Sequence, residues 1–218
     1  GESGHGKSTS IRTLDPKSTF LINVANKLLP FPNSYNLYKP FNRETNEGNL
    51  YVSTDATKIC NLLKYLTKLE HIKNIVIDDF QYIMAYEFIK RAKERGYDKF
   101  TEIGQNAFSI IETAKTMRED QLTFVLSHSE DITTEGYKKT KAKTIGKMLD
   151  EKLTFEGLFS VVLLAIIEKD DDEVKYSFIT RSDGYNTAKS PIGMFDYKIP
   201  NDLNFVANRI REYHNSNN

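Results

Sequence analysis

Cysteine is almost absent from the chain, since Cys60 is the only one in 218 residues. A lone cysteine cannot form a disulfide within the chain, and it excludes a cysteine-based zinc site built by one copy. We therefore expect a reducing compartment, as for a cytoplasmic protein. Long apolar runs are also missing, and the stretch 161–167 is only as long as a strand. A membrane-spanning helix needs about 20 apolar residues, so the sequence predicts no membrane partner.

Net charge is absent as well, because 30 Lys and Arg balance 30 Asp and Glu. A neutral chain has no overall attraction for nucleic acid, so any such binding would need a local basic patch. The composition is 39% hydrophobic and 28% charged, which is typical of an ordered globular protein. The length suits a single domain over residues 1–218.

Short apolar runs alternate with segments of helical spacing. The β-branched and aromatic runs predict strands at 19–24, 75–77, 122–126, 160–167 and 174–179. Helical periodicity and end signals predict helices at 8–14, 55–70, 80–95, 100–118 and 202–214. The polar residues 168–173 read as a hairpin turn, and the proline-containing segment 30–50 as a surface loop or small insertion. This order predicts an α/β fold, with a mostly parallel sheet flanked by helices and a C-terminal β-hairpin.

The strongest motif stands at the start of the chain. Its residues fit the pattern G-x-x-x-x-G-K-[ST] in full, and they are Gly1, Glu2, Ser3, Gly4, His5, Gly6, Lys7 and Ser8, with Thr9 next to them. Glycines let successive backbone N–H groups point at phosphate oxygens, and the following helix offers its positive end. Lys7 would reach the β- and γ-phosphates, and the Ser8 hydroxyl would bind Mg²⁺. The alternative is a glycine-rich turn that matches by chance.

This motif normally follows a buried strand, and the sequence contains no such strand before Gly1. We therefore expect the sequence to be a fragment, or upstream residues to have been left out.

Two acids follow the apolar run 75–77. Asp78 at the end of that strand would bind Mg²⁺ beside Ser8, and Asp79 would orient or deprotonate the attacking water. The alternative for such an acid is an N-cap of the helix that follows, since Asp suits that position.

Polar residues also follow the run 122–126. His128 and Ser127 are candidates for sensing the γ-phosphate, and Glu130 is a second candidate for activating water. A plain polar loop start is the alternative.

Positive charge gathers in one place, within a loop predicted to be mobile over residues 129–149. Five of its lysines are candidates for DNA binding: Lys138, Lys139, Lys141, Lys143 and Lys147. Such a loop could follow a nucleic-acid backbone while Tyr137 stacks on a base. The alternative is a solvated lysine-rich loop.

Several strings together resemble a known family. GESGHGKST, NIVIDDFQY, LSHSED and NTAKSPIGMFDYKIPNDL are similar to segments of phage-encoded P-loop ATP-binding proteins of the RecA-like group, whose relatives include single-strand annealing proteins of the Sak group. The resemblance implies a RecA-like core, ATP and Mg²⁺ as ligands, and single-stranded DNA as partner. It also implies a homo-oligomer, in which Lys189 would reach a neighbouring subunit's nucleotide, and contact with other phage replication or recombination proteins. The glutamate that activates water in RecA-type proteins has no clear counterpart, which leaves the catalytic base open.

The leading hypothesis is therefore a DNA-stimulated ATPase of phage recombination or replication. A P-loop small-molecule kinase is one alternative, although its lid would favour arginine over the lysines found here. A non-catalytic module that binds ATP as a structural ligand is the other.

Overall fold

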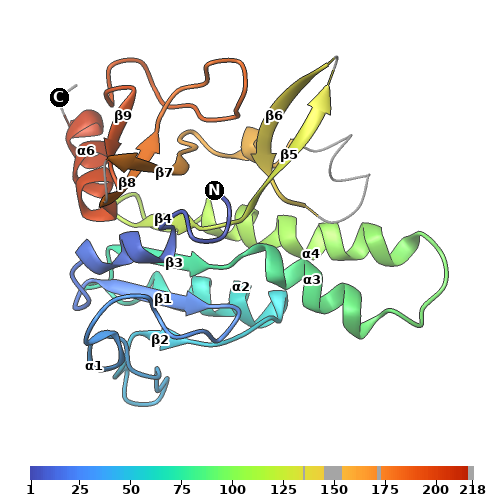
Figure 1. Ribbon diagram of the computed structural model, residues 1–218. Helices are drawn as coiled ribbons and strands as arrows, with labels where there is room; N and C mark the ends of the chain where they lie inside the picture. Colours follow the sequence, from blue (N-terminus) through green and yellow to red (C-terminus); the bar gives the residue numbers. More distant parts are fainter. Residues whose placement is uncertain (135, 145–153, 171–172, 216–218) are drawn as a thin grey trace. The chain divides into compact units, whose positions relative to one another are not determined.

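The computed structural model describes residues 1–134, 136–144, 154–170 and 173–215 (Figure 1). The chain divides into two compact units. Unit 1 consists of Gly1–Thr13, Ser127–Lys143 and Thr154–Asn218, and unit 2 of Leu14–Leu126 and Thr144–Leu153. The expectation of one domain over residues 1–218 stays a prediction.

Unit 2 contains a four-stranded parallel sheet with the strand order β2-β1-β3-β4. Its strands are β1 (Thr19–Asn23), β2 (Leu50–Tyr51), β3 (Asn74–Asp78) and β4 (Leu122–Val125). Every residue of β1 and β3 is buried. Strands buried on both faces read as continuous apolar runs, which is why the sequence predicted these two correctly. Asn23 pairs with Asp78, so the carboxyl ends of β1 and β3 share one edge of the sheet.

Helices accompany this sheet. They are α1 (Ser34–Leu37), α2 (Ala56–Leu66), α3 (Gln81–Lys90) and α4 (Asp98–Ala114). The Asp55 side chain caps α2 by accepting a hydrogen bond from the Lys58 N–H at 3.0 Å. The apolar faces of α2 and α4 are buried, and the two helices pack against each other (Figure 1). The helices predicted at 55–70, 80–95 and 100–118 are confirmed in place as α2, α3 and α4, and each ends earlier than predicted.

The segment 30–50 is more ordered than the sequence suggested. It contains α1, and an isolated parallel bridge joins Pro40 to Leu50, the first residue of β2. β2 then pairs with β1, with Leu21 opposite Leu50. The end of this predicted loop thus becomes a strand of the parallel sheet.

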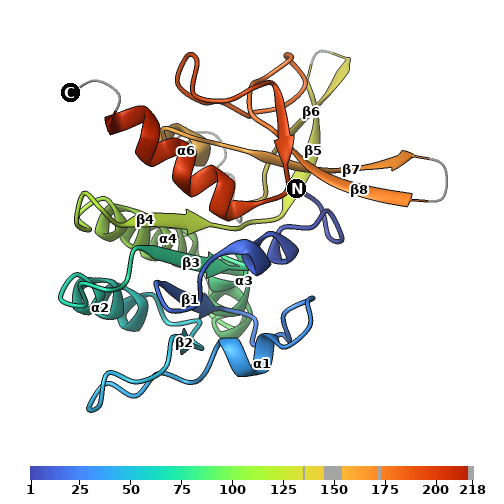
Figure 2. The same ribbon diagram turned by 90° about the vertical axis from the view of Figure 1, so that its left-hand side faces the viewer.

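Unit 1 contains two antiparallel sheets. One has the order β7-β8-β9, from β7 (Leu164–Asp170), β8 (Glu173–Ile179) and β9 (Lys198–Pro200). The pair β7 and β8, clear in Figure 2, is the C-terminal hairpin that the sequence predicts. The run 160–167 predicted a strand from residue 160, whereas β7 begins at Leu164.

The second sheet corrects the sequence prediction. A mobile loop was expected over 129–149, but β5 (Ser129–Thr134) and β6 (Tyr137–Ala142) form an antiparallel hairpin. Ile132, Thr133 and Thr140 supply β-branched residues, and Gly136 takes the positive φ of 88° that the turn requires. Lys147 lies outside the described residues.

The helical parts of unit 1 are η1 (Ser8–Thr13), η2 (Phe155–Leu158) and α6 (Leu203–Asn215). η1 is a 3-10 helix at the place where the sequence predicts a short helix. It contacts α6, whose Asn204 N–H donates to Thr13 Oγ1 at 3.2 Å. Among the described helices, none combines the length and the apolar character needed to cross a membrane.

Candidate functional site

The glycine-rich segment of unit 1 is curled as a phosphate-binding loop requires. Gly4 and Gly6 have positive φ angles of 84° and 80°, whereas His5 between them does not. Alternating signs of φ turn successive N–H groups toward one side, which creates an anion-binding concavity. η1 begins directly after it at Ser8. The predicted loop residues therefore have the backbone shape that their spacing indicates.

The Lys7 side chain folds back over this loop. Its ammonium donates hydrogen bonds to the carbonyl oxygens of Gly1 at 2.8 Å and Glu2 at 2.7 Å. An ammonium has three donors and no acceptor, so it presents a fixed positive charge to any anion in the loop. The side chains of Glu2 and Ser3 are exposed. At the carboxyl end of the loop, the Ser10 hydroxyl donates a hydrogen bond to the Lys7 carbonyl oxygen.

Strands of unit 1 hold the loop in place. The Gly1 carbonyl accepts a hydrogen bond from the Ser129 N–H at 3.1 Å. A Cβ on Gly1 would lie 2.5 Å from the Ala165 carbonyl oxygen, and the His5 ring nitrogen Nδ1 lies 3.1 Å from that same oxygen. The loop is therefore packed directly on the start of β7, where glycine is required at its first position.

Gly6 of the loop also lies close to other parts of unit 1. A Cβ there would lie 2.6 Å from Cδ1 of Tyr176 on β8 and 3.3 Å from Nδ2 of Asn201. Asn201 is 3% exposed and accepts a hydrogen bond from Arg12 at 3.3 Å, and Arg12 also donates to the Thr9 carbonyl at 2.8 Å. The sequence motif does not reveal Tyr176 or Asn201, because each is far along the chain from the loop they support.

The predicted magnesium residue lies in unit 2. Asp78 ends β3 and is 4% exposed, and its carbonyl accepts a hydrogen bond from the Val24 N–H at 3.2 Å. The N-cap interpretation does not hold for either acid. The N-cap of α3 is Phe80, which makes no side-chain capping bond, and the Phe80 N–H donates instead to the Leu126 carbonyl at 2.9 Å.

Asp79 has an unusual backbone and a charged partner. Its φ of 63° is in the left-handed region, which non-glycine residues rarely adopt. Its carboxylate lies 2.6 Å from the Lys27 ammonium. Burial opposes the charged form of Lys27, yet the hydrogen bond and charge of Asp79 outweigh it and raise the pKa of Lys27. Asp79 thus has an ion-pair partner, Lys27, that the sequence motifs do not reveal, and its predicted role with water stays a prediction.

The polar residues from Ser127 onward belong to unit 1. The His128 carbonyl accepts a hydrogen bond from the Lys143 N–H at 2.8 Å, where β5 and β6 meet the rest of the unit. Glu130 stands opposite Lys141 in the hairpin, with 3.5 Å between carboxylate and ammonium. Glu130 is therefore an ion-pair partner, and the roles predicted for Ser127, His128 and Glu130 in sensing phosphate or activating water stay predictions.

The basic hairpin carries acids as well as lysines. Lys138 lies 3.2 Å from Asp131, and the Thr140 hydroxyl donates to Asp131 at 2.8 Å. The hydrogen bond from Thr140 and then that from Lys138 lower the pKa of Asp131, so this carboxylate stays charged at neutral pH. Two of the candidate DNA-binding lysines, Lys138 and Lys141, thus face carboxylates across the hairpin.

Tyr137 and Lys189 also have defined surroundings. The Tyr137 ring lies edge-on to Tyr185, with 6.1 Å between ring centroids and 85° between planes. Both rings keep exposed surface, at 43% for Tyr137 and 60% for Tyr185. Lys189 exchanges two backbone hydrogen bonds with Val162, at 2.8 and 2.9 Å. Its predicted contact with a neighbouring subunit stays a prediction.

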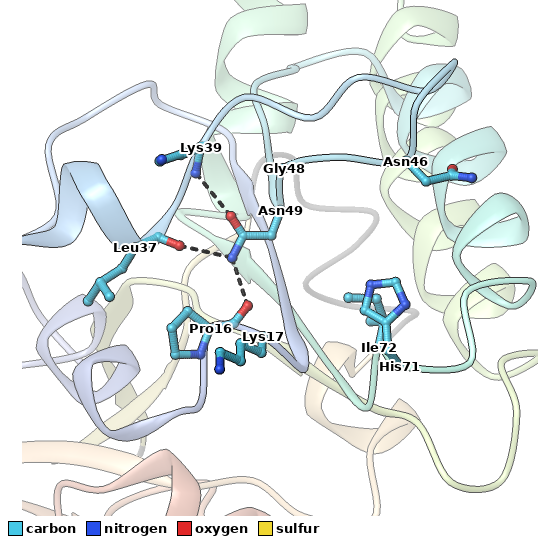
Figure 3. A pocket seen from close by; sticks show the side chains of 9 residues that line it. All are labelled: Pro16, Lys17, Leu37, Lys39, Asn46, Gly48, Asn49, His71 and Ile72. Atoms are coloured by element: carbon cyan, nitrogen blue, oxygen red, sulfur yellow. Dashed lines mark hydrogen bonds between the residues drawn. The ribbon is translucent and has the colours of Figure 1, made fainter.

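Unit 2 also has a pocket that the sequence did not predict (Figure 3). It has a volume of about 250 Å³, and Pro16, Ile72 and Gly48 among its lining residues stand just before β1, β3 and β2. It therefore lies at the amino edge of the sheet, whereas parallel sheets bind ligands beyond the carboxyl ends of their strands. The Asn49 amide donates to the carbonyls of Pro16 at 2.8 Å and Leu37 at 3.1 Å. Asn49 therefore connects two segments of the pocket wall by hydrogen bonds.

Comparisons with known proteins complete the description of the site. No protein-family model matches the chain, and no curated protein matches it. One solved structure similar to the chain is that of a KaiC-like protein from the hyperthermophilic archaeon Pyrococcus horikoshii. Sequence identity is 14% over 82% of this chain and 75% of that chain, and the TM-score is 0.43. Similarity this low identifies no ligand or reaction, so the function is inferred below from the residues of the chain.

Proposed function

We propose that the chain binds ATP with Mg²⁺ and hydrolyses it. The observation that carries the proposal is the curled loop of unit 1, with alternating φ signs at Gly4, His5 and Gly6 and with the Lys7 ammonium bonded across it. Backbone N–H groups, a fixed ammonium and a helix start together favour a polyphosphate ligand. Gly1 to Thr9 would bind the nucleotide.

Magnesium fits the oxygen donors available. Mg²⁺ prefers one or two protein oxygens and keeps several waters, and a serine hydroxyl with a carboxylate is such a donor set. Ser8 and Asp78 would hold the ion in this proposal. The bound ion would supply positive charge that neutralises the phosphates.

We further propose that single-stranded DNA is the partner of the basic hairpin. Strand β6 of the hairpin carries Lys138, Lys139 and Lys141, and Lys143 follows it directly. The Tyr137 side chain is partly exposed. Lysines bind phosphates and aromatic rings stack on bases, which is how proteins bind single strands without sequence preference. The phage recombination or replication context, the RecA-like assembly of several copies and the role of Lys189 come from the family resemblance and belong to the same proposal.

Nucleotide binding is the first test. A fluorescent ATP analogue should bind the chain with Mg²⁺, and Lys7→Gln should weaken binding at least about tenfold, since a hydrogen-bonded charge contributes about 1.5–3 kcal/mol. The matched control is Lys64→Gln, which removes an exposed lysine of α2. Equal affinity of the wild type and Lys7→Gln would contradict the proposal.

Turnover is the second test. Phosphate release should rise when single-stranded DNA is added, and DNA binding should weaken steeply with salt because lysine–phosphate contacts release counterions. Binding without turnover would favour the non-catalytic module. Transfer of phosphate to a small acceptor would favour the kinase.

A further inference from the structure

Two exposed tyrosine rings from different segments of unit 1 contact each other. Tyr137 begins β6, and Tyr185 belongs to the segment between β8 and β9. Their centroids are 6.1 Å apart and their planes meet at 85°, so the edge of one ring points at the face of the other. This arrangement covers at most one face of one ring. Since both residues are exposed, the pair keeps ring surface for a flat ligand.

The segment that carries Tyr185 is hydrogen-bonded to β6. The Thr140 N–H of β6 donates to the Tyr185 carbonyl at 2.8 Å, and an isolated parallel bridge joins Thr140 to Asn186. β6 pairs with β5 along one edge, so this segment occupies the other edge like a short third strand. Tyr185 therefore extends the basic hairpin, although it is distant from it in the sequence.

A buried carboxylate joins the same two segments a second time. Glu156 is 8% exposed, and its Oε1 accepts hydrogen bonds from the Ala142 N–H at 2.7 Å and from the Thr187 hydroxyl at 3.0 Å. Hydrogen bonds to a charged acceptor are stronger than those between neutral groups. The position of Tyr185 is thus set at two successive points along β6.

The turn around Tyr185 is also ordered by its own polar side chains. Asp183 Oδ1 accepts from the Tyr185 N–H at 2.9 Å and from the Asn186 amide at 2.7 Å, and the Ser182 hydroxyl donates to the Asn186 carbonyl at 2.6 Å. Such side-chain bonds to nearby backbone are typical of tight turns. A ligand that stacks on Tyr185 therefore does not have to order the segment first, which favours binding.

Positive charge lies on the same face of the hairpin as the first ring. Side chains alternate along a strand, so Tyr137 shares its face of β6 with Lys139 and Lys141. Aromatic rings next to ammonium groups suit a ligand that carries both flat bases and phosphates. In a duplex the bases are stacked on one another, so their faces are not available to the tyrosines. The arrangement favours a strand with unpaired bases.

We propose that Tyr185 and Tyr137 together stack on unpaired bases, which makes the segment 182–187 a second DNA-binding segment beside the basic hairpin. The inference rests on the proposed function, and it deepens the part that concerns single-stranded DNA. The lysines then supply the affinity that depends on salt. The rings supply affinity that DNA without bases cannot gain.

The experiment compares labelled oligothymidine with an abasic oligonucleotide of the same length and backbone charge. Fluorescence anisotropy should show that the wild type binds oligothymidine more tightly. Tyr185→Leu should weaken binding of oligothymidine at least about fivefold and change binding of the abasic strand less than about twofold. Tyr185→Phe keeps the ring and should bind both strands as the wild type does. The matched control is Tyr197→Leu, which removes a tyrosine of unit 1 that is 43% exposed.

Salt dependence separates stacking from an indirect effect on the lysines. Stacking releases no counterions, so Tyr185→Leu should leave the slope of log affinity against log salt unchanged. A lower slope would show that the substitution displaces lysines, and it would overturn the inference. Tyr137→Leu should weaken oligothymidine binding selectively as well. It provides a second test if thermal unfolding shows that Tyr185→Leu does not fold.

Two further results would overturn the inference while leaving the proposed function intact. One is wild-type affinity for oligothymidine in both folded leucine variants, which would mean that the rings only pack against each other. The other is equal weakening for oligothymidine and the abasic strand. If the wild type binds neither strand at low salt, the proposed DNA partner itself fails, whereas ATP binding is judged separately by Lys7→Gln.

Discussion

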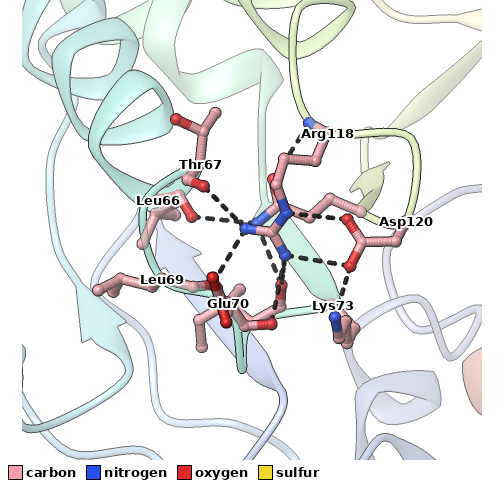
Figure 4. Close-up of polar contacts among 9 residues, drawn as sticks. Leu66, Thr67, Leu69, Glu70, Lys73, Arg118 and Asp120 are labelled. Atoms are coloured by element: carbon pink, nitrogen blue, oxygen red, sulfur yellow. Dashed lines mark hydrogen bonds and ion pairs between the residues drawn. The ribbon is translucent and has the colours of Figure 1, made fainter.

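The guanidinium of Arg118 and the carboxylate of Asp120 form a bidentate ion pair just before β4 (Figure 4). The distances are 2.9 Å from Nε to Oδ1 and 3.2 Å from Nη2 to Oδ2. The same guanidinium donates to four carbonyl oxygens of the loop between α2 and β3, those of Thr67, Leu69, Glu70 and Ile72. This loop leads into β3, so Arg118 helps to set the position of the strand that ends at Asp78.

Replacing Arg118 should therefore cost the protein much of its stability. Arg118→Met keeps a long side chain but removes the guanidinium from four carbonyls, of which those of Leu69 and Ile72 keep a second donor. We expect a loss of about 2–4 kcal/mol in the free energy of unfolding. Arg118→Lys should be nearly as damaging, because one ammonium cannot reproduce the planar fork. Urea unfolding of the three proteins measures both effects. If Arg118→Lys has the same free energy of unfolding as the wild type, the positive charge alone is sufficient and the planar guanidinium is not required.

Acid should weaken the same cluster. The hydrogen bonds from Arg118 and then from Lys73 lower the pKa of Asp120 well below its usual value. A lowered folded pKa stabilises the protein above the unfolded pKa of about 3.9, and this contribution is lost as pH falls further through the folded pKa. Asp120 is 47% exposed, so the contribution is at most about 1 kcal/mol.

The variant Asp120→Asn isolates this contribution. The difference in unfolding free energy between wild type and variant should be constant from pH 7 to about pH 5 and should shrink below about pH 4. Denaturant titrations at several pH values measure it. A difference that stays constant down to about pH 2 would show that Asp120 does not titrate as its partners suggest.

Two glycines of the phosphate loop should respond differently to alanine. Both have positive φ, so each substitution strains the backbone by about 1–2 kcal/mol. A Cβ at Gly4 meets nothing within 4 Å, whereas a Cβ at Gly6 would lie 2.6 Å from the Tyr176 ring. Gly6→Ala should thus lower stability further and disturb nucleotide binding more than Gly4→Ala. Thermal unfolding of both variants with and without ATP measures the two losses. Equal losses of stability and of ATP binding would show that the Tyr176 ring moves aside for the added Cβ.

The sequence predicted the elements whose local pattern is unambiguous. β1 and β3 are buried on both faces, and a continuous apolar run reflects this directly. The hairpin β5–β6 was missed, because β5 carries two adjacent acids and β6 three lysines, and both residue types are uncommon in strands. Its stability comes from pairs across the two strands, which a linear pattern does not reveal.

The residues of the candidate site also differ in whether a local sequence pattern reveals them. The phosphate loop was predicted from spacing alone, because the residues that form such a loop are neighbours in the sequence. Lys27 could not be assigned this way, since its contact with Asp79 depends on the pairing of β1 with β3. A lysine soon after a predicted strand end was the one available signal, and it is too common to be specific.

The lysines of the basic hairpin differ in their contacts. Lys138 and Lys141 face Asp131 and Glu130, whereas the Lys139 backbone pairs opposite Ile132. The charge of a lysine that already faces a carboxylate releases fewer counterions when DNA binds. The two kinds of lysine can therefore be separated by the salt dependence of DNA binding.

Lys139→Ala with Lys143→Ala should lower the slope of log affinity against log salt by about 1.4, because single-stranded DNA contributes about 0.7 for each contacted phosphate. Lys138→Ala with Lys141→Ala removes the same charge and should leave the slope nearly unchanged, although exposed Glu130 and Asp131 would weaken binding by repulsion. Fluorescence anisotropy with labelled oligothymidine at several salt concentrations measures both. If the second double variant lowers the slope as much as the first, the ion pairs open on binding and all four lysines contact DNA.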